Sequence, residues 1–178
     1  MSARDFSIIL AVDSKWWVWK DGSMPWKLPT DLQYFRYITT QTEKQWKRNA
    51  VIMWRKTWDS LPNKFKPLDD RHNIVISRQK KLVHHNVSTM LGIEQALSFA
   101  WNRSDIDKIF IIGGANIYAQ SIHHDKLQNI YLTRIEKDFD CDVFFLWMPE
   151  YFKLTQKTEQ REENGIKFHY EIYERKLQ

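Results

Sequence analysis

The segment KIFIIGGANIY, residues 108–118, indicates the fold class of the chain. It begins with a continuous apolar run of strand length, which is typical of a central strand buried on both faces of a sheet. Two glycines then break the strand, and a helix is expected through Ile117, Tyr118 and Ile122. A buried strand that turns at once into a helix is the repeating unit of α/β proteins.

The same alternation of strand and helix extends to both sides of this segment as far as residue 129. Beyond that point the predicted strands leave little room for helices, and Glu163-Asn164-Gly165 supplies a turn before the last strand. We predict one α/β domain over residues 1–178, with a largely parallel sheet and an antiparallel hairpin at one edge. The strands are expected over residues 6–12, 50–53, 74–76, 87–91, 108–112, 130–135, 141–145, 152–157 and 166–177, and the helices from Thr30, from the turn at 54–58 to Pro62, over 93–101 and over 117–122.

The composition suits a globular domain without disulfides. The 178 residues suffice for a compact core. Cys141 is the only cysteine, so an intrachain disulfide is impossible and a reducing, cytoplasmic compartment is expected. A net charge of +5 is compatible with nucleic acid, an acidic membrane or a small anionic ligand, but the basic residues are spread along the chain. The first apolar run is too short to cross a membrane or to act as a signal peptide.

The segment MPWKLPTDLQYFRYITT, residues 24–40, places a carboxylate on an apolar helix face. Thr30 and Gln33 fit a capping box, so a helix is expected to begin near Thr30. The residues Leu28, Asp31, Leu32 and Phe35 then recur at three- and four-residue steps, so Asp31 shares a helix face with large apolar side chains. Either Asp31 is a half-exposed acid of the first turn that favours the helix dipole, or it points inward, which is costly without a polar partner.

Three predicted strands end in groups that suit a phosphorylated ligand, because ligands of open α/β sheets bind at the carboxyl ends of strands. Strand 109–112 leads into Gly113-Gly114 and a helix N-terminus. The other two strands lead into Arg55, Lys56 and Thr57, and into Ser77 and Arg78. The alternative for the glycine pair by itself is a tight turn.

An ordered set of motifs spans nearly the whole chain. The motifs are Met24-Pro25-Trp26 with Asp31, Val51-Ile52-Met53 with Lys56-Thr57-Trp58, Ser60-Leu61-Pro62, Pro67-Leu68, Arg71-His72-Asn73, Ser77-Arg78, Ile112-Gly113-Gly114 with Tyr118, and Tyr131-Leu132-Thr133-Arg134. This set resembles the dihydrofolate reductase family. The resemblance implies a central, mostly parallel eight-stranded sheet flanked by about four helices, as in other α/β domains.

The resemblance implies hydride transfer from NADPH to dihydrofolate, giving tetrahydrofolate, with a proton added to the adjacent ring nitrogen. Asp31 would hold the pterin and help to supply the proton through water. Trp26 would support Asp31 through a bound water, the Thr133 hydroxyl would close the same network, and Tyr118 is placed in the same catalytic group. The substrate would be enclosed by Ile9, Ala11, Leu32, Phe35, Leu61, Leu68 and Ile112, with Arg71 on its glutamate carboxylate.

The resemblance also implies which residues bind NADPH. Two cations and a hydroxyl around a ribose phosphate favour NADPH over NADH. Neither a metal, a nucleic acid nor a membrane is an expected partner, and a monomer is expected. The cofactor residues would be Ala11, Val18, Arg55, Lys56, Thr57, Ser77, Arg78, Gly113, Gly114, Ala115, Asn116, Ile117 and Tyr118.

Each assignment has a structural alternative when the residues are taken singly. Thr133 suits any strand, Trp26 suits a core, and Arg71 suits a solvated surface. Leu32 and Phe35 would pack inward in any amphipathic helix.

The chain departs from the family at several positions that usually hold glycine. Residues 13–22 are expected to form a loop in which Trp17 and Trp19 replace glycines, and Trp54 and Asp70 replace two more. Leu146-Trp147 stands where a proline is usual. If the usual glycines supply positive backbone angles, each tryptophan in their place costs about 1–2 kcal/mol. If they let the backbone approach the cofactor, an indole fills the space that the cofactor would occupy and weakens its binding.

These departures leave three functions open. The first is an active reductase, the second is a folate-binding relative with weakened or lost cofactor binding, and the third is a basic module that binds nucleic acid through exposed Trp and Arg.

Overall fold

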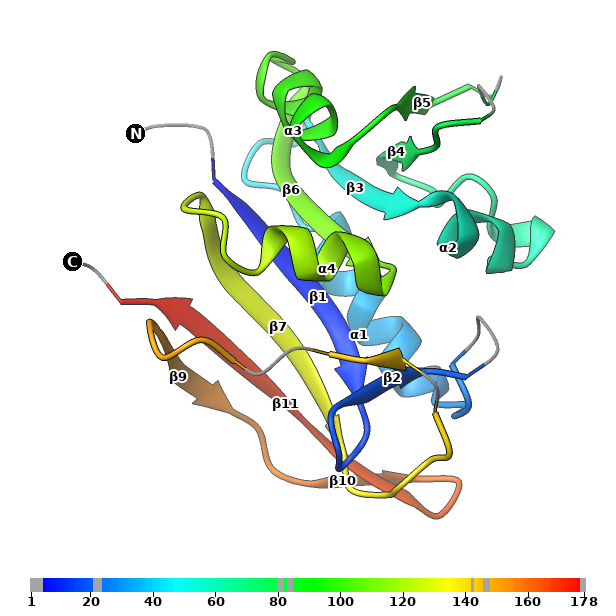
Figure 1. Ribbon diagram of the computed structural model, residues 1–178, viewed down its shortest axis with the longest axis vertical. Coiled ribbons are helices and arrows are strands. Elements are labelled where there is room, and N and C mark those ends of the chain that lie inside the picture. Colours follow the sequence, from blue (N-terminus) through cyan, green and yellow to red (C-terminus); the bar gives the residue numbers. More distant parts are fainter. Residues whose placement is uncertain are drawn as a thin grey trace.

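The computed structural model describes residues 5–20, 24–79, 82, 85–141, 143–145 and 148–176. Figure 1 shows a twisted sheet with helices on both faces. Eight strands follow one another in the order β10-β11-β7-β1-β6-β3-β4-β5, and a ninth, β9, also pairs with β11. The strands of this sheet are β1 (Phe6–Val12), β3 (Arg48–Trp54), β4 (Arg71–Ile76), β5 (Val87–Met90), β6 (Ile106–Gly113), β7 (Leu127–Ile135), β9 (Phe152–Lys157), β10 (Arg161–Glu163) and β11 (Ile166–Arg175).

The strand directions confirm the predicted mostly parallel sheet with an antiparallel edge. Each neighbouring pair from β7 to β5 is parallel. Strand β11 is antiparallel to β7, β9 and β10. The Asn164-Gly165 turn joins β10 to β11, with positive φ at both residues (53° and 70°), as a tight hairpin requires.

The central strands read as continuous apolar runs because both faces of the sheet are covered. Alternate side chains of β3 enter two separate cores: Ile52 packs on the side of α3 (Ile93–Trp101) and α4 (Ala115–Ser121). Val51 packs on the opposite side with Phe35 of α1 (Pro29–Thr40). The remaining helical segments, α2 (Arg55–Ser60) and the 3-10 turn η1 (Asn63–Phe65), follow β3.

The structure corrects the expected loop over residues 13–22. Trp17–Trp19 is a short strand, β2, and it forms a separate two-stranded antiparallel sheet with β8 (Val143–Phe144). The buried Asp13 carboxylate organises this region, because it accepts hydrogen bonds from the backbone N–H groups of Lys15, Trp17 and Phe139 (2.8, 2.9 and 3.1 Å). The strand predicted over 141–145 therefore exists only as β8 and lies outside the main sheet.

The predicted capping box at the start of α1 is wrong. The helix begins at Pro29 with Leu28 at the N-cap, and no side chain of the helix caps it. Instead, Glu163 accepts hydrogen bonds from the Thr30 backbone N–H (3.0 Å) and from the Thr30 hydroxyl (2.9 Å). A carboxylate from the C-terminal hairpin thus satisfies donors of the first helical turn and opposes the positive end of the helix dipole.

Replacing Glu163 by alanine is therefore expected to lower the free energy of unfolding by about 1–2 kcal/mol, the loss of a helix cap and its charge-assisted bonds. Urea denaturation followed by circular dichroism measures this difference. Glu162→Ala removes a neighbouring exposed carboxylate and is the matched control, expected to change stability by under about 0.5 kcal/mol. Equal stability of the two variants would show that the Glu163 contact does not hold α1.

Candidate active site

Asp31 points inward from the first turn of α1. It is only 7% exposed, and its carboxylate accepts a hydrogen bond of 2.6 Å from the Thr133 hydroxyl on β7. Burial raises the pKa of Asp31 to about 6, the charge of Glu163 acts in the same direction, and the bond from Thr133 opposes both. The reading of Asp31 as a half-exposed first-turn acid is therefore wrong.

Strand register explains why Thr133 meets Asp31. Ala11 of β1, Thr133 of β7 and Tyr170 of β11 are register partners in adjacent strands. Trp26 belongs to the same small core as Ala11 and Tyr170. Its ring is 4% exposed, and its indole N–H is buried without a hydrogen-bond partner among the described residues. An unpaired buried donor of this kind suits an ordered water.

Most of the apolar residues expected around the substrate gather in one core on the α1 side of the sheet. Ile9, Ile112 and Leu68 are buried there, and Phe35 and Leu61 pack against them from its edge. Leu32 differs, because 51% of its surface is exposed. Ala11 lies in the neighbouring core with Trp26.

Arg71, at the start of β4, is buried rather than solvated, so the surface-arginine alternative is wrong. Its side chain is held by the Asp69 carbonyl and the Thr39 hydroxyl, both at 2.8 Å, and its guanidinium lies 5.7 Å from the Phe35 ring. In the part of the chain that the structure describes, no carboxylate forms an ion pair with it. The pKa of Arg71 is lowered to about 10, mainly by burial and also by the charge of Arg36, while the charges of Asp70 and Asp69 oppose this shift.

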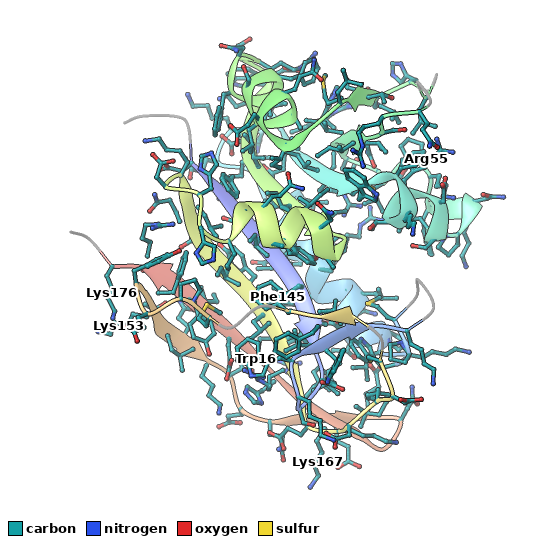
Figure 2. All side chains as sticks on the ribbon, viewed as in Figure 1. Trp16, Arg55, Phe145, Lys153, Lys167 and Lys176 are labelled. Carbon is teal, nitrogen blue, oxygen red and sulfur yellow. The ribbon has the colours of Figure 1, made fainter. Side chains whose placement is uncertain are left out.

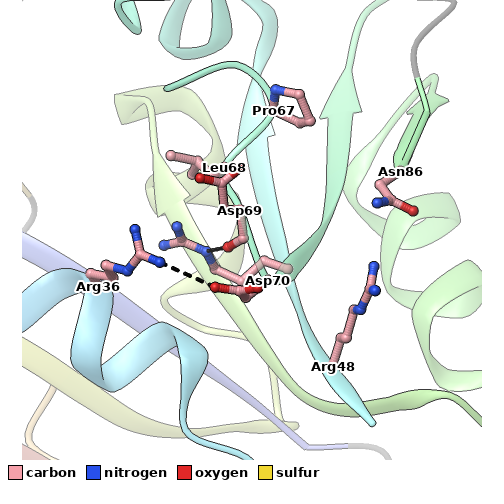
Figure 3. Close-up of a pocket in the computed structure, with 8 residues that line it drawn as sticks. Arg36, Arg48, Pro67, Leu68, Asp69, Asp70 and Asn86 are labelled. Atoms are coloured by element: carbon pink, nitrogen blue, oxygen red, sulfur yellow. Dashed lines mark hydrogen bonds and ion pairs between the residues drawn. The ribbon is translucent and has the colours of Figure 1, made fainter. Parts of the chain in front are cut away.

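A pocket of about 340 Å³ opens beside Arg71. Figure 3 shows Arg36 and Arg48 on its two sides and Leu68 and Pro67 above Asp69 and Asp70. Arg71 therefore lies between Phe35 of the apolar core and the pocket.

The expected phosphate-binding glycines lie where β3 and β6 end side by side. Met53 and Gly113 are register partners, and the following residues start α2 and α4 (Figure 1). A methyl group at Gly114 would lie 3.4 Å from the Thr57 hydroxyl and 3.8 Å from the Trp54 Cβ. Gly113 has φ 143° and a cis peptide bond to Gly114, so this position favours a residue without a side chain.

The cations expected near Gly113-Gly114 differ in whether they already form an ion pair. The Arg55 guanidinium, on α2 at the edge of the molecule (Figure 2), is bound by both carboxylate oxygens of Asp59 (2.8 and 2.9 Å). Lys56 and Arg78 are exposed, and neither pairs with a described carboxylate. Arg78 lies 5.8 Å from the Trp54 ring, and Ser77 beside it is buried.

The remaining predicted cofactor residues lie on α4 and β2. Tyr118 is buried, and its hydroxyl donates a hydrogen bond of 3.1 Å to the Ile9 carbonyl. Burial raises the pKa of Tyr118, so this phenol keeps its proton. Val18 and Ile117 are buried in the α3–α4 core, Ala115 is half-buried, and Asn116 is exposed and bonded to Gln120.

Among the described residues, no group of His, Cys, Asp and Glu side chains is arranged to hold a metal ion. None of the helices in the described ranges has the length and apolar character needed to span a membrane.

Comparison with known proteins decides the family. A family model described as dihydrofolate reductase matches residues 5–175. The chain belongs to the dihydrofolate reductase family.

Curated members of the family match nearly end to end. The dihydrofolate reductase of Heliothis virescens is 34% identical over 184 residues, covering 98% of this chain and 100% of that protein. That of Mus musculus is 34% identical over 186 residues, covering 97% and 98%, and that of Candida albicans is 40% identical over 144 residues, covering 78% and 73%. These matches support the reductase, and no finding favours a folate-binding relative without turnover or a nucleic-acid-binding module.

The tryptophans at the usual glycine positions of dihydrofolate reductases do not strain the backbone as expected. Trp54 has φ −72°, and Trp17 lies in the extended strand β2. Positive φ values do occur at Asp70 (61°), which replaces a usual glycine, and at Trp16 (68°), which does not. The side chain of Trp19 and all of Leu146-Trp147 lie outside the described residues.

Trp16 is held by its surroundings despite its backbone angle. The Arg134 guanidinium lies 3.8 Å from its ring, and its ring stacks on Phe145, as Figure 2 shows at the centre of the molecule. Contacts with a cation and an aromatic ring of this kind contribute about 0.5–2 kcal/mol each, which is comparable with the cost of a left-handed residue.

Sequence reasoning missed Glu163, Tyr34 and Tyr170 near Asp31. The rings of Tyr34 and Tyr170 stack at 3.8 Å. Burial raises the pKa of Tyr170 to about 12, and the negative charge of Asp31 adds to this shift. Tyr34 could have been found, because it lies three residues after Asp31 on the same helix. Glu163 and Tyr170 lie far along the chain, and no local pattern links them to the site.

Proposed function

We propose that this protein reduces 7,8-dihydrofolate to 5,6,7,8-tetrahydrofolate with NADPH. The observation that carries the proposal is the buried Asp31 carboxylate, which accepts a hydrogen bond from the Thr133 hydroxyl. An isolated carboxylate in such a site is costly. A pterin would offset this cost, because its amino group and ring N–H can donate hydrogen bonds to both carboxylate oxygens.

Asp31 is also suited to supply a proton. With its pKa raised to about 6, a substantial fraction of Asp31 is protonated just below neutral pH, as efficient general acid catalysis requires. The unpaired Trp26 N–H would hold a water that carries the proton to the ring nitrogen. Thr133 would hold the carboxylate in place, because its hydroxyl donates a hydrogen bond to Asp31.

Arg71 would bind the carboxylate of the substrate tail. A guanidinium that is 4% exposed and has no ion pair among the described carboxylates needs an anion to compensate its buried charge. The Asp69 carbonyl and Thr39 hydroxyl hold it in place, which leaves its remaining N–H groups for the ligand.

The cofactor rim fits NADPH. Bound NADPH would supply the hydride for the pterin carbon next to the protonated nitrogen. The close approach of Gly114 to Thr57 and Trp54 leaves backbone rather than side chains toward a pyrophosphate, and Lys56, Arg78 and Ser77 would bind the ribose phosphate. Arg55, Val18, Ala115, Asn116 and Ile117 complete the proposed cofactor residues, and Ala11 and Tyr118 lie where cofactor and substrate would meet.

The decisive experiment follows the absorbance of NADPH while purified protein is mixed with dihydrofolate, and repeats the reaction with NADH. We expect turnover with both, and kcat/KM at least tenfold higher with NADPH, because two cations face the extra phosphate. No oxidation of NADPH by the folded protein would refute the reductase. Equal use of NADH would refute only the role of Lys56 and Arg78.

The proposal also covers the compartment, the domain organisation and the oligomeric state of the protein. We place the protein in a reducing cytoplasmic compartment because its single cysteine permits no intrachain disulfide. We treat residues 1–178 as one domain that acts as a monomer. The continuous sheet from β10 to β5, built from both ends of the chain, supports the single domain.

A further inference from the structure

The β10–β11 hairpin is bonded to α1 at the residue that precedes Asp31. The Glu163 carboxylate accepts hydrogen bonds from the Thr30 backbone N–H (3.0 Å) and from the Thr30 hydroxyl (2.9 Å). The phenol of Tyr170, on β11, donates a longer bond of 3.4 Å to the Thr30 carbonyl. Each polar atom of Thr30 therefore has a partner on the hairpin.

The same hairpin packs against the next turn of α1. The rings of Tyr34 and Tyr170 stack with their centroids 3.8 Å apart and their planes 19° from parallel. Because Tyr34 lies three residues after Asp31 and Thr30 lies one residue before it, the hairpin contacts the helix on both sides of the carboxylate. These contacts fix the part of α1 from which Asp31 projects.

The buried position of Asp31 requires a restraint of this kind. A buried carboxylate gains free energy by moving into water, and α1 has no side-chain cap of its own to hold its first turn. A first turn without the hairpin contacts would be free to rotate Asp31 toward solvent. That rotation would break the hydrogen bond of 2.6 Å from the Thr133 hydroxyl.

Glu163 also acts on Asp31 through its charge. Burial raises the pKa of Asp31, and the charge of Glu163 acts in the same direction. Glu163 is half-buried, whereas Asp31 is 7% exposed. When two carboxylates repel each other, the proton goes to the one whose charged form is less well solvated, which here is Asp31.

The other titratable groups on the elements around Asp31 stay in one charge state while Asp31 titrates. They are phenols, Tyr34 of α1, Tyr131 of β7 and Tyr170 of β11, and burial raises the pKa of each. Arg161 of β10 is an exposed cation that lies 5.7 Å from the Tyr170 ring and opposes the shift at that phenol. Glu163 is therefore the carboxylate through which the hairpin acts on Asp31.

We propose that Glu163 is a positioning residue for Asp31, because it binds Thr30 and so fixes the helical turn that presents the Asp31 carboxylate to Thr133. Its negative charge has a second effect, since it favours the protonated form of the acid. This inference rests on the proposed function, in which Asp31 helps to supply a proton to the pterin. It places control of the proton donor on a strand 133 residues from Thr30 in the chain.

Carbon-13 NMR of protein labelled in its aspartate carboxyl groups measures the titration of Asp31 without substrate or cofactor. The signal of Asp31 is assigned by its absence from Asp31→Asn. We expect a midpoint near pH 6 in the wild-type protein. In Glu163→Gln we expect a midpoint at lower pH, because the negative charge is removed while one acceptor oxygen for Thr30 is kept. Glu162→Gln removes an exposed carboxylate from the same strand and should leave the midpoint unchanged.

The decline of kcat with rising pH gives a second measurement, in assays with saturating NADPH and dihydrofolate. We expect kcat of Glu163→Gln to be about two- to fivefold below that of the wild-type protein at pH 8, as for a partly exposed charge contact, and close to it at pH 5. Glu163→Ala also removes the bonds to Thr30, so a further loss of kcat is expected at both pH values. A structural role alone would lower kcat by the same factor at pH 5 and at pH 8.

The outcomes separate this inference from the function on which it rests. An unchanged Asp31 titration in Glu163→Gln, or an equal loss of kcat at the two pH values, would overturn the role of Glu163 and leave the reductase intact. A shifted titration in a protein that oxidises no NADPH would support the coupling of the two carboxylates and refute the reductase. Thermal melting of each variant confirms that it is folded.

Discussion

Asp31→Asn is expected to lower kcat for dihydrofolate reduction by a factor of about 10²–10⁴, the usual contribution of a positioned general acid. Asparagine has nearly the same shape and can still accept the hydrogen bond of the Thr133 hydroxyl, but it cannot release a proton. Stopped-flow or steady-state assays with NADPH measure the loss. Calorimetric binding of NADPH is the control and should be unchanged. An activity within threefold of the wild-type protein would remove Asp31 from the proton path.

The pH dependence of kcat in the wild-type enzyme should report the titration of Asp31. Asp31 has its pKa raised to about 6, so the protonated form is lost as the pH rises through that value. We expect kcat to fall about tenfold per pH unit above pH 6 if the proton comes from Asp31. The variant should show no such decline, and a flat profile in the wild-type enzyme would contradict the assignment.

The same substitution should stabilise the fold. The native pKa of Asp31 is raised above its ordinary value of 3.8, so the native state binds the proton more tightly than the unfolded state does. Stability of the wild-type protein therefore falls as the pH rises from about 4 to about 6. Asp31→Asn escapes this penalty and should gain about 1–3 kcal/mol at pH 7 and little at pH 4, measured by urea denaturation.

Arg71→Gln is expected to raise KM for dihydrofolate at least about 30-fold, with a smaller effect on kcat. Breaking a buried charge pair typically costs about 2–5 kcal/mol, and Arg71 is 4% exposed. The bound carboxylate lies far from the reacting ring, so its loss weakens binding rather than chemistry. Arg71→Lys should recover only part of the affinity, because an ammonium cannot form the paired hydrogen bonds of a guanidinium.

Arg36→Gln is the matched control for Arg71. It removes a positive charge from the same pocket, but Arg36 is exposed and already paired with Asp70. We expect its KM to change by less than about threefold. Similar changes in the two variants would show that the pocket attracts the substrate only by overall charge and that Arg71 forms no specific bond.

The sequence predicted the central architecture because a strand that is buried on both faces has apolar residues at successive positions. Residues 50–53 of β3 and 109–112 of β6 are apolar throughout, and Gly113-Gly114 marks the turn from β6 into α4. The same local logic placed Asp31 on an apolar helix face, since helical spacing depends only on neighbours in the chain. The antiparallel edge hairpin followed from a pattern of this kind.

What local patterns could not supply were contacts between distant segments. Thr30 and Gln33 have the spacing of a capping box, yet Glu163 bonds to Thr30 because folding of the C-terminal hairpin brings a stronger acceptor to the helix. The pairing of β2 with β8 joins segments about 125 residues apart and turns an expected loop into a strand. Leu32 has the spacing of a core residue, but no other element covers it.

The sequence by itself determined the alternation of strands and helices, the family and the residue types that carry the chemistry, because these depend on composition and short-range spacing. Only the tertiary structure decided that Arg71 is buried without an ion pair among the described carboxylates, and that Trp16 rather than Trp17 or Trp54 has the left-handed backbone. Burial and pairing are properties of the assembled surroundings, and the free energy of a charge is set by those surroundings.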